Sequence, residues 1–196
     1  MLFVAKKRVC LNARILAMPE ILLSRQQIAG RVAELGQQIT ADFAGQSVLL
    51  IGVLKGACMF LGDLARQIQL DSTFDFIAVR SYGNDRQSTG EVQLIKDVTM
   101  PLRNQNVILV EDILDTGLTM TFLKKMLMAH QPRILKTATL LDKPSRRVLP
   151  IEADYVGFLI PDRFVIGYGL DYAERYRNLP DICILADGPQ SSGKIG

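Results

Sequence analysis

Short, continuous apolar segments separated by helical patterns are the feature that most constrains this fold. The run Val48–Leu54 contains no polar side chain, and residues 107–110 and 155–160 repeat the pattern. Strands that are buried on both faces of a sheet have this composition. Between such runs, apolar residues recur at helical spacing. Alternating strands and helices predict an α/β fold with a mostly parallel sheet and helices on both faces.

Three segments show the helical pattern. Ser24 and Gln27 form a capping box that predicts the start of the first helix, and Gly45 is expected to end it. The other two helices are expected at residues 57–69 and 119–129, with the single histidine, His130, at the end of the third. Further strands are expected at residues 74–80, 91–97 and 134–141, and the polar segment 81–90 is expected to be a mobile loop.

Composition limits the class of protein. A chain of 196 residues suits one domain with a sizeable core, and no apolar run approaches the roughly 18 residues that cross a bilayer. The three cysteines are far apart and odd in number, which argues against a disulfide framework. A soluble cytoplasmic protein with reduced thiols and no membrane association is therefore expected.

The positive charge is concentrated at the N-terminus. The chain has 23 basic and 20 acidic residues, but residues 1–19 contain four basic side chains and no acid, so the remainder carries 19 against 20. A nucleic-acid-binding domain would need a basic face of its own, so no nucleic-acid partner is expected. We expect an extension at residues 1–19, with Met18 as an alternative start, a domain at 20–186 and a flexible tail at 187–196.

The most informative segment runs from residue 107 to residue 119. A buried strand leads to Glu111 and Asp112, and a turn with Gly117 then leads into a helix. Backbone N–H groups at such a turn form an anion pocket. Two acids beside that pocket would repel a bare phosphate, so the ligand is expected to bring hydroxyl groups or a cation such as Mg²⁺. A surface turn with capping acids is the simpler alternative, but it does not explain three acids together with Thr-Gly-Leu-Thr.

This segment resembles the phosphoribosyl-pyrophosphate motif of the type I phosphoribosyltransferases. Further segments resemble the hypoxanthine-guanine branch of that family in order and spacing, and the resemblance covers residues 21–185. They are Leu54-Lys55-Gly56, Ser81-Tyr82-Gly83, Asp142-Lys143-Pro144, and residues 164–171 running into 172–177. The resemblance implies a small hood built from the N- and C-terminal parts, a homodimer or homotetramer, and transfer of 5-phosphoribose to hypoxanthine or guanine, giving IMP or GMP.

The resemblance also implies roles for individual residues. Asp115 is expected to be the general base or acid near purine N7, and Glu111 and Asp112 to face the ribose hydroxyls and their Mg²⁺. Asp171 is expected at a second Mg²⁺ and beside the purine. The 5-phosphate would be held by Asp115, Thr116, Gly117, Leu118 and Thr119, together with Glu111 and Asp112. Pyrophosphate would be met by Lys55, Gly56, Ser81, Tyr82 and Arg177, and the purine by Lys143, Phe164, Val165 and Asp171.

Some alternatives stay open at this stage. In the family the Leu54–Lys55 bond is often cis, which is a hypothesis for this chain. Lys143, expected to donate to the purine O6, disfavours adenine but does not separate guanine from xanthine. A regulatory relative that binds RNA or protein would keep the phosphate loop and could lose the base pocket. The Gly-Lys sequence at 193–194 lacks the Ser or Thr and the following helix that a Walker A motif requires.

Overall fold

The computed structural model describes residues 20–81 and 92–185, and a six-stranded sheet forms its centre. The expected N-terminal extension, loop residues 82–90 and C-terminal tail lie outside these residues. The strand order is β4-β3-β2-β5-β6-β7; β4 is antiparallel to β3 and every other neighbouring pair is parallel. The strands are β2 (Val48–Leu54), β3 (Ser72–Ser81), β4 (Val92–Lys96), β5 (Asn106–Leu114), β6 (Ile134–Asp142) and β7 (Tyr155–Leu159).

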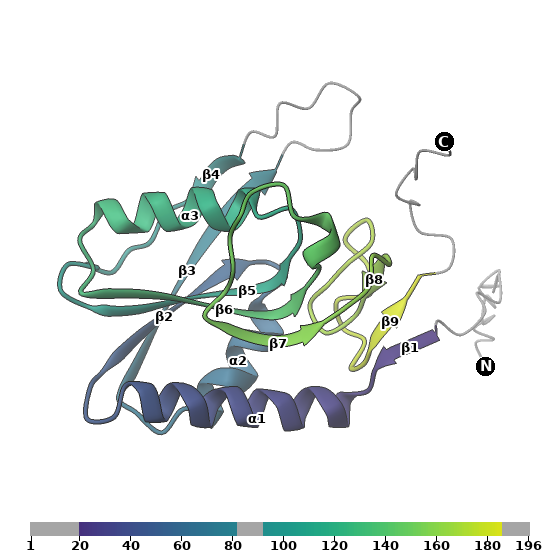
Figure 1. Cartoon of the computed structure of the whole chain (residues 1–196), viewed down its shortest axis with the longest axis horizontal. Coiled ribbons are helices and arrows are strands. Elements are labelled where there is room, and N and C mark those ends of the chain that lie inside the picture. The colour runs from purple at the N-terminus through teal and green to yellow at the C-terminus, as the bar shows by residue number, and fades with distance from the viewer. Residues whose placement is uncertain (1–19, 82–91, 186–196) are drawn as a thin grey trace, which may run out of the picture.

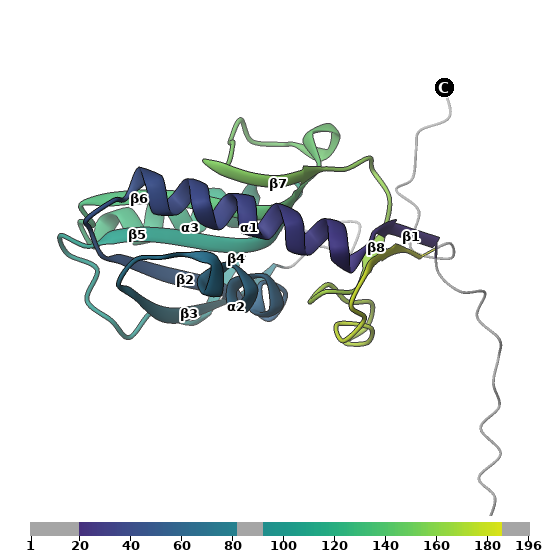
Figure 2. The same cartoon turned by 90° about the horizontal axis from the view of Figure 1, so that it is seen from below.

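Helices cover both faces of this sheet, as the sequence predicts. Helices α1 (Arg25–Asp42) and α2 (Cys58–Gln67) pack on one face, and α3 (Leu118–Ala129) packs on the other (Figures 1 and 2). Two apolar cores result. Side chains of α1 and α2 meet one side of the strands, as Leu35 and Leu50 do, whereas α3 contributes Leu123 to the core on the opposite side. The α/β prediction is confirmed.

The ends of α1 follow the local sequence signals. Ser24 Oγ accepts a hydrogen bond from Gln27 N at 3.3 Å, and Ser24 N donates to Gln27 Oε1 at 2.9 Å, which completes the predicted capping box. After Phe43, which caps the other end, Gly45 adopts a positive φ of 73° that lets the chain turn back toward β2. His130 caps the end of α3, as expected.

A second, three-stranded sheet forms the predicted hood. It joins β1 (Glu20–Leu23) with β9 (Ile182–Ile184) and β8 (Val165–Ile166), in antiparallel pairs. The hood lies beyond the carboxyl ends of the parallel strands (Figure 1). Its individual strands are two to four residues long and are not predicted from sequence, because such short segments show no period and depend on partners far away in the chain.

Strand β5 is longer than its apolar run. The sequence suggests that the strand ends at Glu111 and Asp112, but pairing with β6 continues to Leu114, which lies opposite Asp142. The backbone of these polar residues still finds hydrogen-bond partners on β6, so the strand does not stop where its hydrophobic pattern stops. Within residues 20–81 and 92–185, no helix is long and apolar enough to cross a membrane. Cys58 and Cys183 are both free thiols.

Candidate active site

Glu111 and Asp112 bring a buried and a half-buried carboxyl group to the carboxyl end of β5. Glu111 is 6 % exposed, and its Oε2 has no hydrogen-bond partner within the described part of the chain. Burial, reinforced by the charge of Asp112, raises the pKa of Glu111 well above its ordinary value. Burial also raises the pKa of Asp112 to about 6, against the opposing effects of the Ile113 N–H and of Arg177. Such a pair is costly in an empty site and would gain from a bound hydroxyl or cation.

The predicted anion turn follows directly. Gly117 adopts a φ of 85° and is the N-cap of α3, where backbone N–H groups lack helical partners. A Cβ at this position would stand 2.6 Å from Ile151 Cγ2, so both the backbone angle and the available space favour glycine. Thr116 O accepts hydrogen bonds from Val148 N and Leu149 N, so the segment after β6 holds the turn from outside.

Arg147 ties the ends of β5 and β6 together, a role that sequence reasoning missed. Its side chain is 14 % exposed, donates to Leu114 O at 3.0 Å and to Asp115 O, and forms an ion pair with Asp142. The sequence places two arginines, Arg146 and Arg147, shortly after the predicted purine-binding segment at 142–144. This position could have indicated a residue that supports the site. One guanidinium with several donors suits this task better than a lysine ammonium would.

A cluster of opposite charges surrounds Asp115. Arg146 Nε lies 3.3 Å from Asp115 Oδ1, and Arg146 Nη1 lies 3.9 Å from Asp162. Lys143 is 7 % exposed, and its N–H donates to Leu114 O. Burial lowers the pKa of Lys143, although Asp115 and Asp162 partly oppose the shift. The structure therefore places the predicted base and the predicted O6 donor within electrostatic reach of each other.

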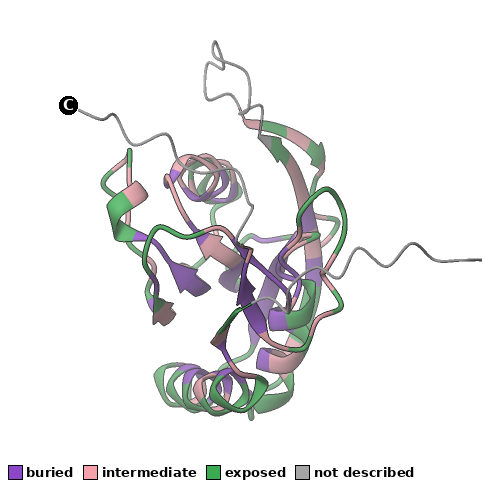
Figure 3. Cartoon of the chain, turned by 90° about the vertical axis from the view of Figure 1, so that its right-hand side faces the viewer, coloured by how far each residue is buried: buried purple, intermediate pink, exposed green. Residues whose placement is uncertain are grey.

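The side chains predicted to hold the purine ring lie at the hood. Val165 is buried in β8, and the half-buried Phe164 forms an edge-to-face pair with Tyr172, with ring centroids 5.6 Å apart. Lys143 directly follows β6 and Phe164 directly precedes β8, at the end of the molecule that carries the hood. Figure 3 looks onto this end and shows buried strand segments at the centre, with exposed and half-buried helices and loops around them.

Two further loops, which carry Gly56 and Gly169, converge near Asp112. The Leu54–Lys55 peptide bond is cis, as hypothesised. Gly56 follows it so closely beside Asp112 that a Cβ would stand 1.7 Å from Asp112 Oδ2. Gly169, with a φ of 100°, packs on Gly56 O, where a Cβ would be 2.1 Å away. Three separate segments of the chain therefore converge at this point.

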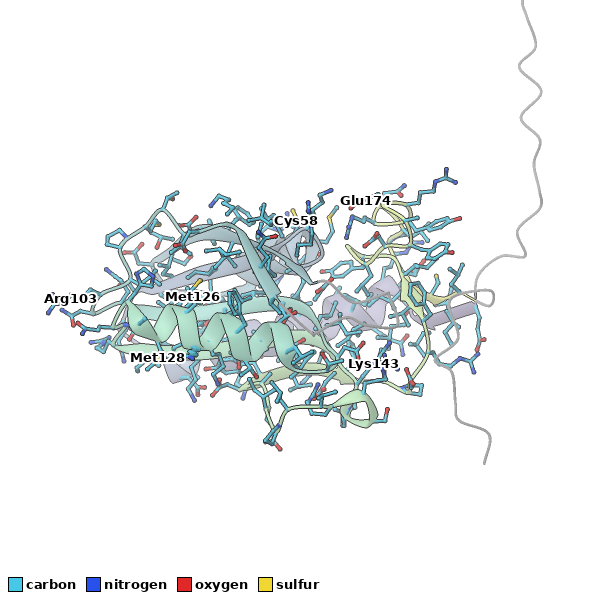
Figure 4. All side chains as sticks on the ribbon, turned by 90° about the horizontal axis from the view of Figure 1, so that it is seen from above. Cys58, Arg103, Met126, Met128, Lys143 and Glu174 are labelled. Atoms are coloured by element: carbon cyan, nitrogen blue, oxygen red, sulfur yellow. The ribbon has the colours of Figure 1, made fainter. Side chains whose placement is uncertain are left out.

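Two of the predicted pyrophosphate residues, Lys55 and Arg177, pair with acids from the loop after Gly169. Arg177 donates to Gly169 O at 2.8 Å and pairs with Asp171 at 2.8 Å. Lys55 Nζ lies 2.9 Å from Glu174 Oε2, a residue that sequence reasoning did not single out. The Lys55 ammonium holds the pKa of Glu174 below its ordinary value. Figure 4 shows Glu174 and Lys143 at the same end of the sheet. The Ser81 side chain and Tyr82 lie outside the described residues.

The acids suit a hard cation only if a ligand completes its coordination. In the described part of the chain, no three His, Cys, Asp or Glu side chains are close enough to hold a metal ion by themselves. Magnesium commonly binds one or two carboxylates and takes its remaining oxygens from substrate and water. The unpartnered Glu111 Oε2 and the neighbouring Asp112 fit that pattern, and Asp171 is near enough to Asp112 to influence its pKa.

An anion turn, buried acids and converging loops at the carboxyl end of a parallel sheet define a nucleotide-type ligand site. A family model described as "Phosphoribosyl transferase domain" matches residues 20–173. The hypoxanthine-guanine phosphoribosyltransferase of Bacillus subtilis is 46 % identical over 166 residues, which cover 85 % of this chain and 92 % of that protein. The chain belongs to the phosphoribosyltransferase family, in its hypoxanthine-guanine branch.

Solved structures agree with the sequence relatives. A crystal structure of a hypoxanthine-guanine phosphoribosyltransferase from Bacillus anthracis, with a HEPES molecule in the active site, is 50 % identical. The two structures align with a TM-score of 0.81, and the aligned part covers 85 % of this chain and 98 % of the Bacillus anthracis chain. The bifunctional protein TilS/HprT of Listeria innocua is 46 % identical, but this chain spans only about a quarter of its length (26 %).

Proposed function

We propose that the protein transfers the 5-phosphoribosyl group of phosphoribosyl pyrophosphate to hypoxanthine or guanine. The bond from the anomeric carbon to pyrophosphate breaks, a bond to the purine nitrogen forms, and the nucleotide is IMP or GMP. The observation that carries this proposal is the adjacent pair of acids, the buried Glu111 and the half-buried Asp112, which leads through Asp115 into the turn at Gly117. Relatives named for this activity support it.

The proposed chemistry needs little covalent work from the protein. The sugar carbon becomes oxocarbenium-like, as in other glycosyl transfers, and the incoming purine becomes partly positive. Asp115 would accept or share the purine N7 proton, a role for which hydrogen-bond reach matters most. The N–H groups at residues 115–119 would hold the 5-phosphate, and Glu111 and Asp112 would hold the ribose hydroxyls.

The remaining site residues are assigned either to the purine or to pyrophosphate. Lys143 would donate to O6, with Phe164 stacked on the purine and Val165 at its edge. Lys55, Gly56, Ser81, Tyr82 and Arg177 would meet pyrophosphate. Lys143 and Phe164, the residues proposed to hold the base, are both present in the chain together with the proposed phosphate loop, which favours an enzyme over a regulatory relative that binds RNA.

Mg²⁺ is the proposed cofactor. Glu111 and Asp112 would hold it through the ribose hydroxyls, and Asp171 would hold a second ion near the purine. Bound there, it would neutralise charge that develops on the departing pyrophosphate. A homodimer or homotetramer and a cytoplasmic location stay predictions from the family resemblance and from the cysteine usage.

A product assay tests the proposed function. The full chain is incubated with phosphoribosyl pyrophosphate, Mg²⁺ and one base at a time, and nucleotide is measured by chromatography. We expect IMP from hypoxanthine and GMP from guanine, with little product from adenine or uracil. Product from xanthine would indicate a pocket that accepts oxopurines broadly, whereas its absence would indicate a pocket limited to hypoxanthine and guanine. No nucleotide from any oxopurine would contradict the proposal and favour the binding-protein alternative.

A further inference from the structure

The carboxylate of Glu174 occupies a position that an anionic ligand would be expected to take. We propose that Glu174 is an internal substitute for pyrophosphate: it bridges Lys55 and Arg177 in the ligand-free protein and is displaced when pyrophosphate binds. The inference rests on the proposed pyrophosphate role of those two cations. It assigns Glu174 a part in setting the affinity for pyrophosphate and in its release.

One oxygen of Glu174 contacts both cations. Its Oε2 lies 2.9 Å from Lys55 Nζ and 3.4 Å from Arg177 Nη2. Lys55 is 119 positions away in the chain, so the carboxylate connects the loop after β2 with the loop that precedes β9. A single carboxylate oxygen between two cations resembles one oxygen of a bound phosphate.

The backbone holds Glu174 in this position. Positive φ values occur at three residues of this loop: 51° at Ala173, 63° at Glu174 and 74° at Tyr176. Residues other than glycine rarely adopt such angles. Glu174 N donates to Asp171 Oδ2 at 2.8 Å, and Asp171 Oδ1 accepts from Arg177. The loop therefore directs the carboxylate toward the two cations at a conformational cost, which is a pattern found at functional sites.

The contact is also weak enough to be replaced. The side chains of Lys55 and Glu174 are 66 % and 65 % exposed, and exposed ion pairs contribute little. Arg177 Nε is buried without a hydrogen-bond partner among the described residues, so Glu174 leaves one donor unused. Pyrophosphate carries more charge and more acceptor oxygens than one carboxylate. It can therefore displace Glu174, and the returning carboxylate would assist its departure.

The test compares two variants at residue 174 with the unaltered full-length protein. Binding of pyrophosphate in the presence of Mg²⁺ is measured by calorimetry and as product inhibition. We expect Glu174→Gln to bind pyrophosphate about two- to tenfold more tightly, the range that follows from losing one or two exposed ion pairs. Binding of GMP, which carries no pyrophosphate group, should be unchanged. A merely structural defect would weaken pyrophosphate binding instead.

Glu174→Asp separates contact from charge. The shorter side chain keeps the charge but withdraws it from Lys55, so this variant should also bind pyrophosphate more tightly. Glu152→Gln, which removes an exposed acid that pairs with neither cation, should match the unaltered protein. The inference is overturned if Glu174→Gln leaves pyrophosphate affinity unchanged or weakens it, or if Glu174→Asp behaves as the unaltered protein does.

The underlying site assignment is tested separately. Lys55→Ala and Arg177→Ala should each weaken pyrophosphate binding, and Glu174→Gln in a Lys55→Ala background should have a smaller effect than it has alone. If neither cation variant weakens pyrophosphate binding, the pyrophosphate assignment is wrong. If both do and Glu174→Gln has no effect, only the role of Glu174 is wrong.

Discussion

Gly56 packs directly against Asp112: a Cβ at residue 56 would stand 1.7 Å from Asp112 Oδ2 and 2.5 Å from its Cγ. No rotation of a methyl group relieves such an overlap, so the Asp112 side chain or one of the two segments must move. The loop after β2 and the end of β5 can approach this closely only because residue 56 lacks a side chain.

Gly56→Ala is therefore expected to displace Asp112 and to lower kcat/KM for phosphoribosyl pyrophosphate. A displacement of about 1 Å at a reacting centre can cost roughly a hundredfold in rate. Steady-state kinetics and a melting curve measure the effect. Gly62→Ala is the matched control, because this exposed α2 glycine has open space around it and should keep its activity. Normal kinetics for Gly56→Ala would contradict the assigned role of Asp112.

Asp115→Asn is expected to lower turnover far more than it weakens binding of the 5-phosphate. Asparagine fits the same turn, but it cannot take a proton or oppose the positive charge of the purine. General acid–base catalysis contributes on the order of 10²–10⁴-fold, and we expect a loss of kcat in that range. Single-turnover rates and substrate affinities separate the two effects. If turnover stays near normal, Asp115 serves only to shape the turn.

Lys143→Met should weaken purine binding while it leaves phosphoribosyl pyrophosphate binding nearly unchanged. Methionine fills the buried space but cannot donate to O6. A hydrogen bond from a charged donor contributes on the order of 1.5–3 kcal/mol, so KM for hypoxanthine and guanine should rise about tenfold or more. Unchanged KM values for both bases would refute the O6 assignment. Lys125→Met, on the exposed side of α3, is a suitable control.

Removal of divalent cations should abolish turnover. The buried Glu111 and the half-buried Asp112 adjoin each other with raised pKa values, and Mg²⁺ held through the ribose hydroxyls would compensate their charge. Activity is measured after treatment with excess chelator and again after Mg²⁺ is added back. Full recovery is expected, because the ion is proposed to act with the bound substrate rather than to hold the fold together. Undiminished turnover in excess chelator would contradict the metal assignment.

Protonation of Asp75 should make the protein less stable in acid. Burial alone would raise its pKa, but N–H donors of Met100, Phe76 and Thr99, together with Lys96, outweigh burial and lower the pKa to about 2. A carboxyl with a lowered pKa stabilises the fold above its ordinary pKa of 3.8 and loses that contribution as the pH falls toward 2. The shift corresponds to roughly 2 kcal/mol in the free energy of unfolding.

Urea unfolding at pH 7 and pH 2.5 tests this expectation. Asp75→Asn should unfold more easily than the unaltered protein at pH 7, and the difference should shrink at the lower pH. Asp71→Asn, at an exposed position before β3, should change little at either pH. An equal loss for Asp75→Asn at both pH values would show that its charge is not the stabilising factor.

The sequence by itself determined the central sheet, the three helices and the anion turn. Each depends on local rules: Val48–Leu54 is apolar throughout, Ser24 and Gln27 cap a helix together, and Gly117 accepts a positive φ. The family resemblance then supplied the expected site residues and the hood. None of these inferences requires knowledge of which distant residues meet.

Tertiary structure alone decided the contacts between distant segments. Glu174 meets Lys55 across 119 positions, and Arg147 donates to the carbonyl groups of Leu114 and Asp115, 33 and 32 positions earlier in the chain. The short strands of the hood likewise exist because β1 pairs with β9 from the other end of the chain. Such contacts depend on how the whole chain packs, and a short segment shows no period or cap that encodes its remote partner.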